Sequence, residues 1–400
     1  MKKIFSLILV SLLFKQLSAQ EIKLAPTPPM GWMSWNLLSD KVNEKDLMQI
    51  ADAMHSSGMV KAGYEYIFID DCWQGGRDIR NNIIADAKKF PSGIKALADY
   101  LHAKGMKLGI YSDAAPLTCA GYTASLNFEE QDAKTFAKWG VDYLKYDYCN
   151  APEDVKTAKI RYKKMADALR KSGRDIVFGV CEWGPREAWN WGAEIGAQSW
   201  RTTFDLRDKW IDIEHKGGVG IYDVIDKNAG LAQFSGPGHW NGGDQLVIGL
   251  KGVKGPAGDL GGKGCTSNEY QTQMSMWCML NSPLYATNDL RTMTEETKTL
   301  LTNPEVLALN QDALGKQAER KIKTEVWDVF VRPLANGDYA VAVLNKSTTA
   351  QTAKINFADL GISDKYEIRD VWAHKVIGKG KNWTGKVDTH ETKVFRLKKI

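Results

Sequence analysis

Short apolar runs alternate with amphipathic stretches through the first three quarters of the chain. Each run ends in polar residues, which is typical of a strand buried on both faces of a parallel sheet. Eight such strands are predicted, within residues 30–36, 64–71, 106–113, 141–149, 175–183, 199–205, 239–244 and 283–289. Helical stretches follow most of them, at 44–57, 94–104, 128–139, 154–172, 186–195 and 268–280.

This alternation predicts an α/β fold, a closed (β/α)8 TIM barrel. An open doubly wound sheet is the alternative, but the chain contains no GxGxxG phosphate loop of the kind such sheets often carry. Since a barrel takes roughly 250 to 300 residues, the 400-residue chain leaves room for a second, smaller domain.

After about residue 318 the pattern changes to short strands with alternating apolar and polar positions, separated by turn residues such as Asn336-Gly337. This predicts a C-terminal antiparallel β-sandwich over 318–400, following a barrel over 20–317. The turns of this part carry no cluster of acids or aromatic residues, so we expect its role to be structural.

The first nineteen residues differ from the rest. Lys2 and Lys3, an apolar run, and Leu17-Ser18-Ala19 are typical of an export signal cleaved near Ala19. Its apolar core is too short to span a membrane, and no later segment is long and apolar enough to do so. We therefore expect a soluble exported protein, periplasmic or extracellular, without stable membrane insertion.

Composition changes this picture little. Lys and Arg number 53 against 48 Asp and Glu, without blocks of like charge, so we expect no nucleic-acid partner. The six cysteines permit disulfides in an exported chain but show no zinc-type CxxC spacing, so we predict neither metal nor cofactor. The fourteen tryptophans suit stacking against sugar rings, and the oligomeric state is left open.

Acidic residues recur where predicted strands end. Asp147 in DYLKYDYCN is the clearest case, although an ion pair with Lys145 explains that stretch alone equally well. The C-terminal ends of parallel strands meet at one rim, where barrel enzymes gather their catalytic groups. Seven of the eight strands place an acid there. Helix caps and isolated ion pairs explain this recurrence poorly. These acids are Asp70, Asp71, Asp113, Asp147, Glu182, Asp205, Asp244 and Asp289.

Such a ring of acids, with aromatic residues nearby, suits glycosidic bond cleavage. That reaction needs one carboxylic acid to protonate the leaving oxygen and one carboxylate to attack or to activate water. The alternative from another class is a sugar-binding protein on a scaffold that has lost catalysis.

Seven motifs in order carry a resemblance to a known family. They are PPMGWMSWN, IDDCW, LGIYSD followed by TCAG, YLKYDYC, CEWG, SWRTTFD and WNGGDQLVIG. Together they resemble the melibiase-type α-galactosidases, glycoside hydrolase family 27, over about residues 26–315. The C-terminal strands resemble the β-sandwich of that family.

The resemblance implies a retaining mechanism that releases terminal α-linked galactose. Asp147 matches the nucleophile and Asp205 the general acid and base. Different roles require environments that separate the two pKa values. We expect Lys145 to keep Asp147 ionised, while Asp205, near Asp244 and aromatic walls, holds its proton.

The resemblance also implies the residues that bind the sugar. Asp70 and Asp71 match those for the 4- and 6-hydroxyls, and Lys145 matches the residue for the 3- and 4-hydroxyls. Glu182, Arg201 and Asp244 match residues that face the 2-hydroxyl. Trp35 and Tyr111 match residues that line the pocket.

Cys119 and Cys149 match positions that the family joins by a disulfide; the alternative is two buried thiols. Cys72 lacks the partner that many relatives carry, so we expect a free buried thiol. Where relatives often have WNDPDML, this chain has WNGGDQL, which keeps Asp244 but loses an acid and a proline.

Two further expectations concern the sugar. Relatives acting on N-acetylgalactosamine have small residues where this chain has Glu182, which favours galactose. Relatives preferring L-arabinopyranose lengthen one acid of the Asp70-Asp71 pair, which is unchanged here, so space for the CH2OH group should remain.

Overall fold

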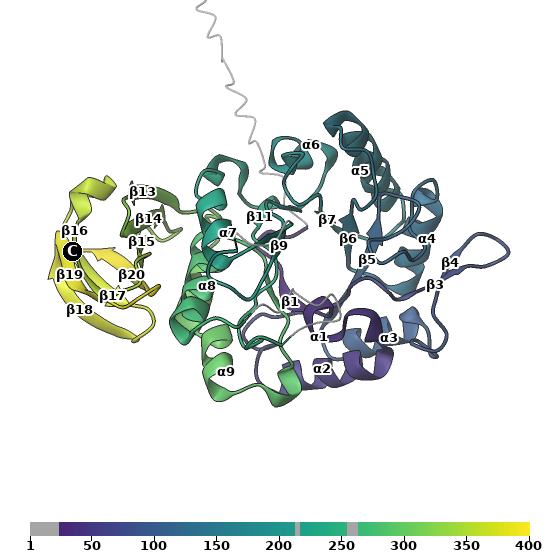
Figure 1. Ribbon diagram of the computed structural model, residues 1–400, viewed down its shortest axis with the longest axis horizontal. Helices are drawn as coiled ribbons and strands as arrows, with labels where there is room; N and C mark the ends of the chain where they lie inside the picture. The colour runs from purple at the N-terminus through teal and green to yellow at the C-terminus, as the bar shows by residue number, and fades with distance from the viewer. Residues whose placement is uncertain (1–23, 213–216, 254–262) are drawn as a thin grey trace, which may run out of the picture.

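The computed structural model describes residues 24–212, 217–253 and 263–400. The expected export signal at residues 1–19 lies outside them. A sheet of eight parallel strands forms the centre of the larger part (Figure 1). Its strands are β1 (Met30–Met33), β2 (Tyr66–Ile69), β5 (Lys107–Asp113), β6 (Tyr143–Asp147), β7 (Val177–Val180), β8 (Ser199–Arg201), β11 (Trp240–Gly242) and β12 (Leu284–Ala286).

The sheet curls round on itself in the order β11-β8-β7-β6-β5-β2-β1-β12. A parallel bridge between Leu246, just after β11, and Ala286 in β12 joins its two edges. The Leu246 N–H donates to the carbonyl of Tyr285 at 2.7 Å across this junction. The predicted α/β barrel is thereby confirmed, with all eight strands at their expected places.

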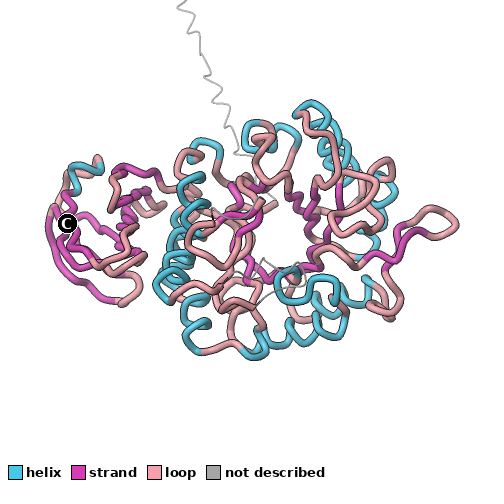
Figure 2. The backbone as a smooth tube through the Cα atoms, in the orientation of Figure 1, coloured by secondary structure: helices cyan, strands magenta, loops and turns pink. Residues whose placement is uncertain are grey.

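Helices surround the strands, as Figure 2 shows in cyan around magenta. Their bounds are α1 (Trp35–Leu38), α2 (Glu44–Ser56), α3 (Ile94–His102), α4 (Glu129–Trp139), α5 (Val155–Arg170), α6 (Gly192–Ile195), α7 (Ile221–Asn228), α8 (Ser267–Met279), α9 (Glu295–Thr302) and α10 (Pro304–Asn310). Local sequence sets several ends: the Asn43 side chain caps α2 by accepting from the Asp46 N–H at 3.0 Å. Gly140 ends α4 in the left-handed conformation that glycine tolerates (φ +84°).

Two segments differ from the sequence expectation. The strand predicted over 199–205 ends at Arg201, and β9 (Asp205–Leu206) instead pairs with β10 (Gly218–Val219) outside the barrel sheet. The helix predicted over 186–195 is a 3-10 turn at Ala188–Asn190 followed by the short α6. At the start of the predicted helix, the N–H groups of Arg186 and Ala188 instead donate to the buried carboxylate of Glu182.

A hairpin of β3 (Gln74–Arg77) and β4 (Ile83–Ala85) projects from the barrel beyond β2 (Figure 1). Arg77 anchors it through two hydrogen bonds to the buried Asp132 in α4, at 2.7 and 2.8 Å. The sequence pattern did not predict this hairpin.

The C-terminal part is antiparallel, as predicted. Six strands form one sheet in the order β13-β14-β15-β20-β17-β18, and β16 pairs with β19. The bounds are β13 (Glu319–Lys323), β14 (Trp327–Pro333), β15 (Tyr339–Asn345), β16 (Gln351–Asn356), β17 (Tyr366–Asp370), β18 (Lys375–Gly380), β19 (Asn382–Val387) and β20 (Thr392–Lys399). Buried side chains including Val329, Val341, Phe357 and Phe395 form a separate core between the sheets.

The two parts meet at α8 and at the segment after β9. His390, just before β20, stacks on Trp210 with ring centroids 4.3 Å apart. The same histidine contacts the Glu269 carboxylate at 2.6 Å. Trp372 donates from its indole nitrogen to the hydroxyl of Ser275 in α8 at 2.9 Å. Within the described ranges, none of the helices combines the length and apolar character needed to cross a membrane.

Candidate active site

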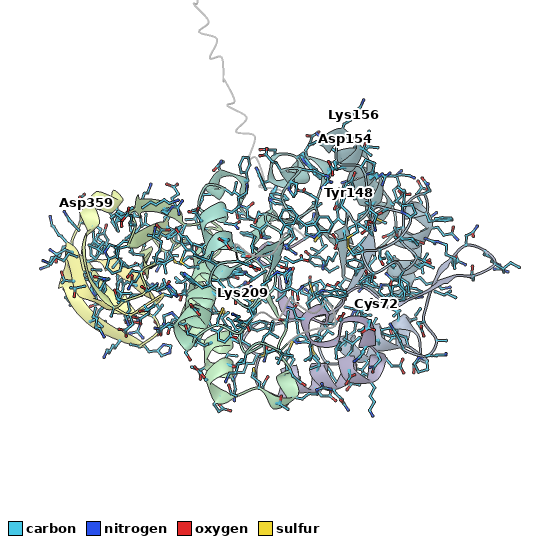
Figure 3. All side chains as sticks on the ribbon, viewed as in Figure 1. Cys72, Tyr148, Asp154, Lys156, Lys209 and Asp359 are labelled. Atoms are coloured by element: carbon cyan, nitrogen blue, oxygen red, sulfur yellow. A yellow bond between two sulfur atoms is a disulfide. The ribbon has the colours of Figure 1, made fainter. Side chains whose placement is uncertain are left out.

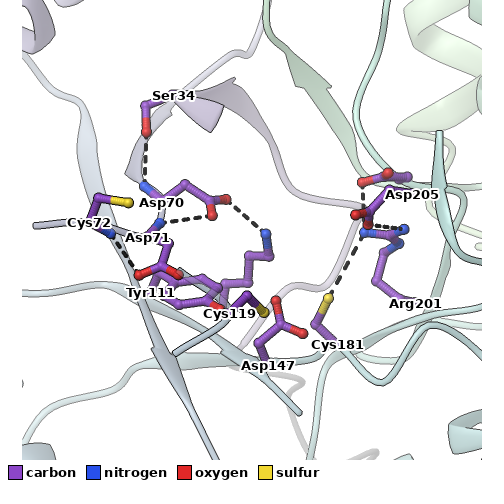
Figure 4. Close-up of polar contacts among 12 residues, drawn as sticks. Ser34, Asp70, Asp71, Cys72, Tyr111, Cys119, Asp147, Cys181, Arg201 and Asp205 are labelled. Atoms are coloured by element: carbon purple, nitrogen blue, oxygen red, sulfur yellow. Dashed lines mark hydrogen bonds and ion pairs between the residues drawn. The ribbon is translucent and has the colours of Figure 1, made fainter. Parts of the chain in front are cut away.

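A pocket of about 580 Å³ lies at the C-terminal ends of the barrel strands. It brings together eight of the predicted site residues: Trp35, Asp70, Asp71, Tyr111, Lys145, Asp147, Asp205 and Asp244. Figure 4 shows Asp70, Asp71 and Tyr111 on one side of Asp147, with Arg201 and Asp205 on the other. Asp289, the last strand-end acid, is paired with Arg291 instead and does not line this pocket.

The first side of the pocket is built on an ion pair. Lys145 Nζ lies 2.8 Å from Asp70 Oδ2, although the two residues are far apart in sequence. Burial works against the charge of Lys145, but the negative charges around it, that of Asp70 first and that of Asp147 as well, together outweigh burial and raise the pKa of the ammonium above its ordinary value. The Asp70 N–H in turn donates to the Ser34 hydroxyl at 2.9 Å, which ties the end of β2 to the end of β1.

Asp71 faces the same side and is held by backbone donors. Its Oδ1 accepts from the Cys72 N–H at 2.7 Å and its Oδ2 from the Ala120 N–H at 2.9 Å. Burial raises the pKa of Asp71. Cys72 has a left-handed backbone (φ +73°) that turns the chain back under the carboxylate. Its thiol is free and buried, as expected; Figure 3 labels Cys72 among the side chains of the barrel.

A disulfide joins Cys119 to Cys149, as the resemblance implied. Both cysteines line the pocket, and the bridge connects the loops that follow β5 and β6. It lies beside Ala120, the donor to Asp71, and the Tyr111 hydroxyl lies 3.1 Å from the Cys119 sulfur. The bridge therefore holds a wall of the pocket in addition to stabilising the fold.

Asp147 ends β6 at the floor of the pocket, where it is buried. Burial raises the pKa of Asp147 to about 7; Lys145 opposes this rise and the charge of Asp205 adds to it. The expectation that Lys145 keeps Asp147 ionised is therefore only half right, because burial outweighs the lysine. The ammonium donates one of its three N–H groups to Asp70.

Arg201 organises the opposite side. Its guanidinium lies 2.8 Å from an oxygen of Asp244 and 3.2 Å from one of Asp205. Asp244 also accepts from the Leu206 N–H at 2.8 Å, and burial raises its pKa although Arg201 opposes the shift. Arg201 lies behind these acids and does not itself line the pocket. Asp205 remains the most open of the three, with 44% of its side chain exposed.

Glu182 is not in the pocket. Its carboxylate is fully buried and accepts from the Arg186 N–H at 2.7 Å and the Ala188 N–H at 3.0 Å. Burial raises the pKa of Glu182 to about 7. The structure thus directs Glu182 toward its own loop, so it does not reach the 2-hydroxyl side as the resemblance implied.

Its two neighbours are closer to the site instead. Trp183 lines the pocket, and the sulfur of Cys181 lies 3.9 Å from Arg201. β7 ends at Val180, and Trp183 has a left-handed backbone (φ +59°), so the alternation of a strand does not continue through CEWG. The turn after β7 sets these directions, and the local sequence carries no signal that singles out Cys181.

One group of side chains has the composition of a metal site. Ligand atoms of Asp113, Asp147, Cys119 and Cys149 lie within 4.8 Å of one another. Both sulfurs are bonded to each other, however, which leaves two carboxylates as donors. Burial and the charge of Asp147 raise the pKa of Asp113 well above its ordinary value, which disfavours the charged carboxylate that a metal ligand needs.

Comparison with known proteins matches both parts of the chain. The family model described as Alpha galactosidase A, Melibiase, matches residues 27–312, and that of the alpha galactosidase C-terminal beta sandwich domain matches 324–397. This chain belongs to the melibiase family. It is 43% identical to Alpha-galactosidase A of Cellvibrio japonicus, over 96% of this chain and 95% of the relative.

Solved structures of the melibiase family share the fold. Alpha-galactosidase I from Mortierella vinacea superposes with a TM-score of 0.89 at 34% identity, covering 95% of this chain and 99% of that one. A family 27 β-L-arabinopyranosidase from Geobacillus stearothermophilus gives 0.82 at 26% identity, covering 93% and 96%. The expected assignment to glycoside hydrolase family 27 is confirmed, and the chain is a glycosidase.

Proposed function

We propose that this melibiase-family protein is a retaining, exo-acting α-galactosidase that removes terminal α-linked D-galactose from oligosaccharides or polysaccharides. The observation that carries the proposal is the position of Asp147 and Asp205 on one pocket, together with a paired lysine and further acids. The carboxylates of that pocket are suited to accept hydroxyl protons.

In the first step, the Asp147 carboxylate attacks the anomeric carbon of the galactose unit. As this bond forms, the bond to the leaving oxygen breaks, and Asp205 donates its proton to that oxygen. The product is a galactosyl ester of Asp147. The buried floor position suits this role, because the ester is shielded from water until the leaving group departs.

In the second step, Asp205 takes a proton from a water molecule, which attacks the anomeric carbon. The bond to Asp147 breaks, and galactose leaves with its original anomeric configuration. Asp205 must exchange a proton in each step, and the exposure of its side chain at the mouth of the pocket supports this assignment.

Sugar recognition follows from the two sides of the pocket. Asp70, Asp71 and Lys145 bind the 3-, 4- and 6-hydroxyls, and Asp244, held by Arg201, binds on the 2-hydroxyl side. Trp35, Tyr111 and Trp183 supply aromatic walls for the ring. Because Glu182 is turned away, any bias against a 2-acetamido group must come from the residues that line the pocket, such as Trp183.

β-L-Arabinopyranosides are the second candidate substrates, since a family 27 structural neighbour is a β-L-arabinopyranosidase. L-Arabinopyranose lacks the CH2OH group of galactose. Asp70 and Asp71 are both short acids, which leaves space for that group and favours galactose. N-Acetylgalactosaminides are a third candidate, and binding without hydrolysis is opposed by the presence of both Asp147 and Asp205 in the pocket.

Hydrolysis of matched 4-nitrophenyl glycosides tests the proposal. The α-galactoside should be cleaved with a kcat/KM far above those of the α-N-acetylgalactosaminide and the β-L-arabinopyranoside. Proton NMR should show α-galactose as the first product. Activity confined to either of the other sugars, or β-galactose as first product, would overturn the proposal.

We also propose that the chain is exported after cleavage near Ala19, and that the barrel and the C-terminal sandwich divide near residue 318. The disulfide at the pocket supports export, because such bonds persist in oxidising compartments. N-terminal sequencing of the mature protein, recovered from the periplasm or medium, tests the cleavage site.

A further inference from the structure

Gln245 stands in a wall shared by two cavities. One is the sugar pocket, and the other is a cavity of about 450 Å³ deeper in the barrel. Among the described residues, three line both: Lys145, Asp244 and Gln245. Gln245 is only 6% exposed, so its amide faces these cavities and not the bulk solvent.

The side-chain amide of Gln245 is incompletely hydrogen-bonded within the described residues. Its oxygen Oε1 is buried without a hydrogen bond in the part that the structure describes. Its backbone carbonyl, by contrast, accepts from Gln273 Nε2 at 3.2 Å, so the main chain is held in place. Buried amides are normally hydrogen-bonded, which indicates that the partners of this one come from outside the protein.

The deeper cavity offers a complement to the amide oxygen. Arg201 lines it, and the guanidinium atom Nε is likewise buried without a partner among the described residues. A donor and an acceptor that face one cavity without touching are well placed to share a bridging water molecule. Such a bridge would turn Oε1 inward and leave the NH2 group of Gln245 facing the sugar pocket.

We propose that Gln245 is a sugar-binding residue that donates a hydrogen bond from Nε2 to the 3-hydroxyl of the terminal galactose. The 3-hydroxyl is chosen because Gln245 lies beside Lys145, on the side of the 3- and 4-hydroxyls, and Asp244, on the side of the 2-hydroxyl. This inference rests on the proposed function and adds a specificity residue to it. A methionine, present at this position in the WNDPDML pattern, has no group that could donate.

Substitution of Gln245 by methionine tests the inference, because methionine keeps the length of the side chain and removes the amide. Wild type and Q245M would be compared on 4-nitrophenyl α-galactoside and on its 3-deoxy analogue, and by calorimetric titration with galactose and 3-deoxygalactose. Gln131→Met in α4, outside the site, is the matched control, and circular dichroism verifies the fold of each variant.

We expect Q245M to lower kcat/KM and galactose affinity roughly 3- to 10-fold, the usual effect of losing one neutral hydrogen bond. On the 3-deoxy sugars the variant and wild type should agree within about twofold. An equal loss on both sugars, or no loss on either, would overturn the inference. If Q245M fails to fold, Gln245→Leu is judged by the same ratio.

The proposed function can fail separately. In that case the wild-type protein would not hydrolyse the α-galactoside at all. The titrations would still show whether Gln245 binds the 3-hydroxyl of bound galactose.

Discussion

The two sides of the sugar pocket solve the same problem differently. On the lysine side, the cation Lys145 pairs with one acid, Asp70, and backbone N–H groups hold Asp71. On the arginine side, one guanidinium is shared between Asp205 and Asp244. Figure 4 shows the two arrangements flanking Asp147.

Solvent exposure sets Asp205 apart from the other acids, including Asp244 on its own side, whose side chain is 7% exposed. The Asp70 side chain is 4% exposed and that of Asp205 is 44% exposed. A buried acid in a fixed position suits recognition of sugar hydroxyls that keep their protons during the reaction. An acid that donates and accepts protons must reach solvent. The difference suggests that the lysine side chiefly binds and the arginine side chiefly moves protons, and five variants can break or sharpen this division.

Asp147 lies between the two sides, and its substitution should have the largest effect on turnover. Asp147→Asn removes the attacking carboxylate, and we expect kcat to fall roughly 10⁴-fold or more while galactose binding remains. Asp113→Asn is the matched control: burial raises the pKa of Asp113 and favours its neutral form, so the amide is a close replacement and the loss should be far smaller. Steady-state kinetics and calorimetry measure both. Equal losses in the two variants would refute the nucleophile assignment.

Asp205→Ala tests proton transfer on the arginine side. Without the acid, substrates with poor leaving groups should lose about 10²- to 10⁴-fold in kcat/KM, and dinitrophenyl galactosides much less. Azide needs no deprotonation, so it should attack the galactosyl ester of Asp147 and yield α-galactosyl azide. NMR identifies that product. Its absence, with equal losses on all leaving groups, would remove Asp205 from the reaction.

Lys145→Met tests the lysine side. Loss of a charged hydrogen bond to the sugar should raise KM roughly 10- to 100-fold. Lys145 also lowers the pKa of Asp147, so its removal should raise that pKa further and move the acid limb of kcat/KM to higher pH. Lys107→Met, on the strand end away from the pocket, should shift neither quantity. An unchanged acid limb would show that Lys145 does not influence the nucleophile.

The double variant Cys119→Ser, Cys149→Ser tests the disulfide. The bridge closes a loop with a sequence separation of 30, so its loss should cost about 3 to 4 kcal/mol of unfolding free energy. KM should rise only several-fold, because Ala120 would support Asp71 less firmly. Urea unfolding and steady-state kinetics measure these effects. A lost kcat with normal stability would mean that the bridge acts in the chemistry.

Glu182→Gln should have the smallest effect on the sugar. The amide can accept from only one of the two N–H groups that Glu182 serves, so unfolding free energy should fall by about 1 kcal/mol. KM should change by less than about twofold, since the side chain does not line the pocket. A tenfold rise in KM at unchanged stability would restore Glu182 to the sugar site.

The sequence predicts the barrel well because the buried strands of a parallel sheet are continuous apolar runs. The acids at the ends of these runs, such as Asp70 and Asp147, then mark one rim of the barrel without knowledge of tertiary contacts. The β3–β4 hairpin is not predicted, because its strand sequences QGGR and IIA are short and two of the four residues of the first are glycine.

Contacts between segments far apart in the sequence explain the features that were not predicted. Nothing local in SWRTTFD shows that the strand stops at Arg201 and that Asp205 pairs with Gly218 in a separate sheet. Likewise, only the fold shows that Lys145 in β6 bonds to Asp70, which directly follows β2, two places away in the sheet. The environment of Asp147 was misjudged for this reason, since burial and not its nearest lysine sets the direction of its pKa.

The stack of Trp210 on His390 links the C-terminal sheets to the segment that begins with Asp205. Backbone bonds from Ile221 to Lys209 and from Tyr222 to Trp210 fasten that segment to α7. A barrel cut off before β13 would keep Asp147, the proposed nucleophile, on a strand of the central sheet. It would lose one support of the segment that carries Asp205, the proposed proton donor, so the small domain helps to hold Asp205 in place opposite Asp147.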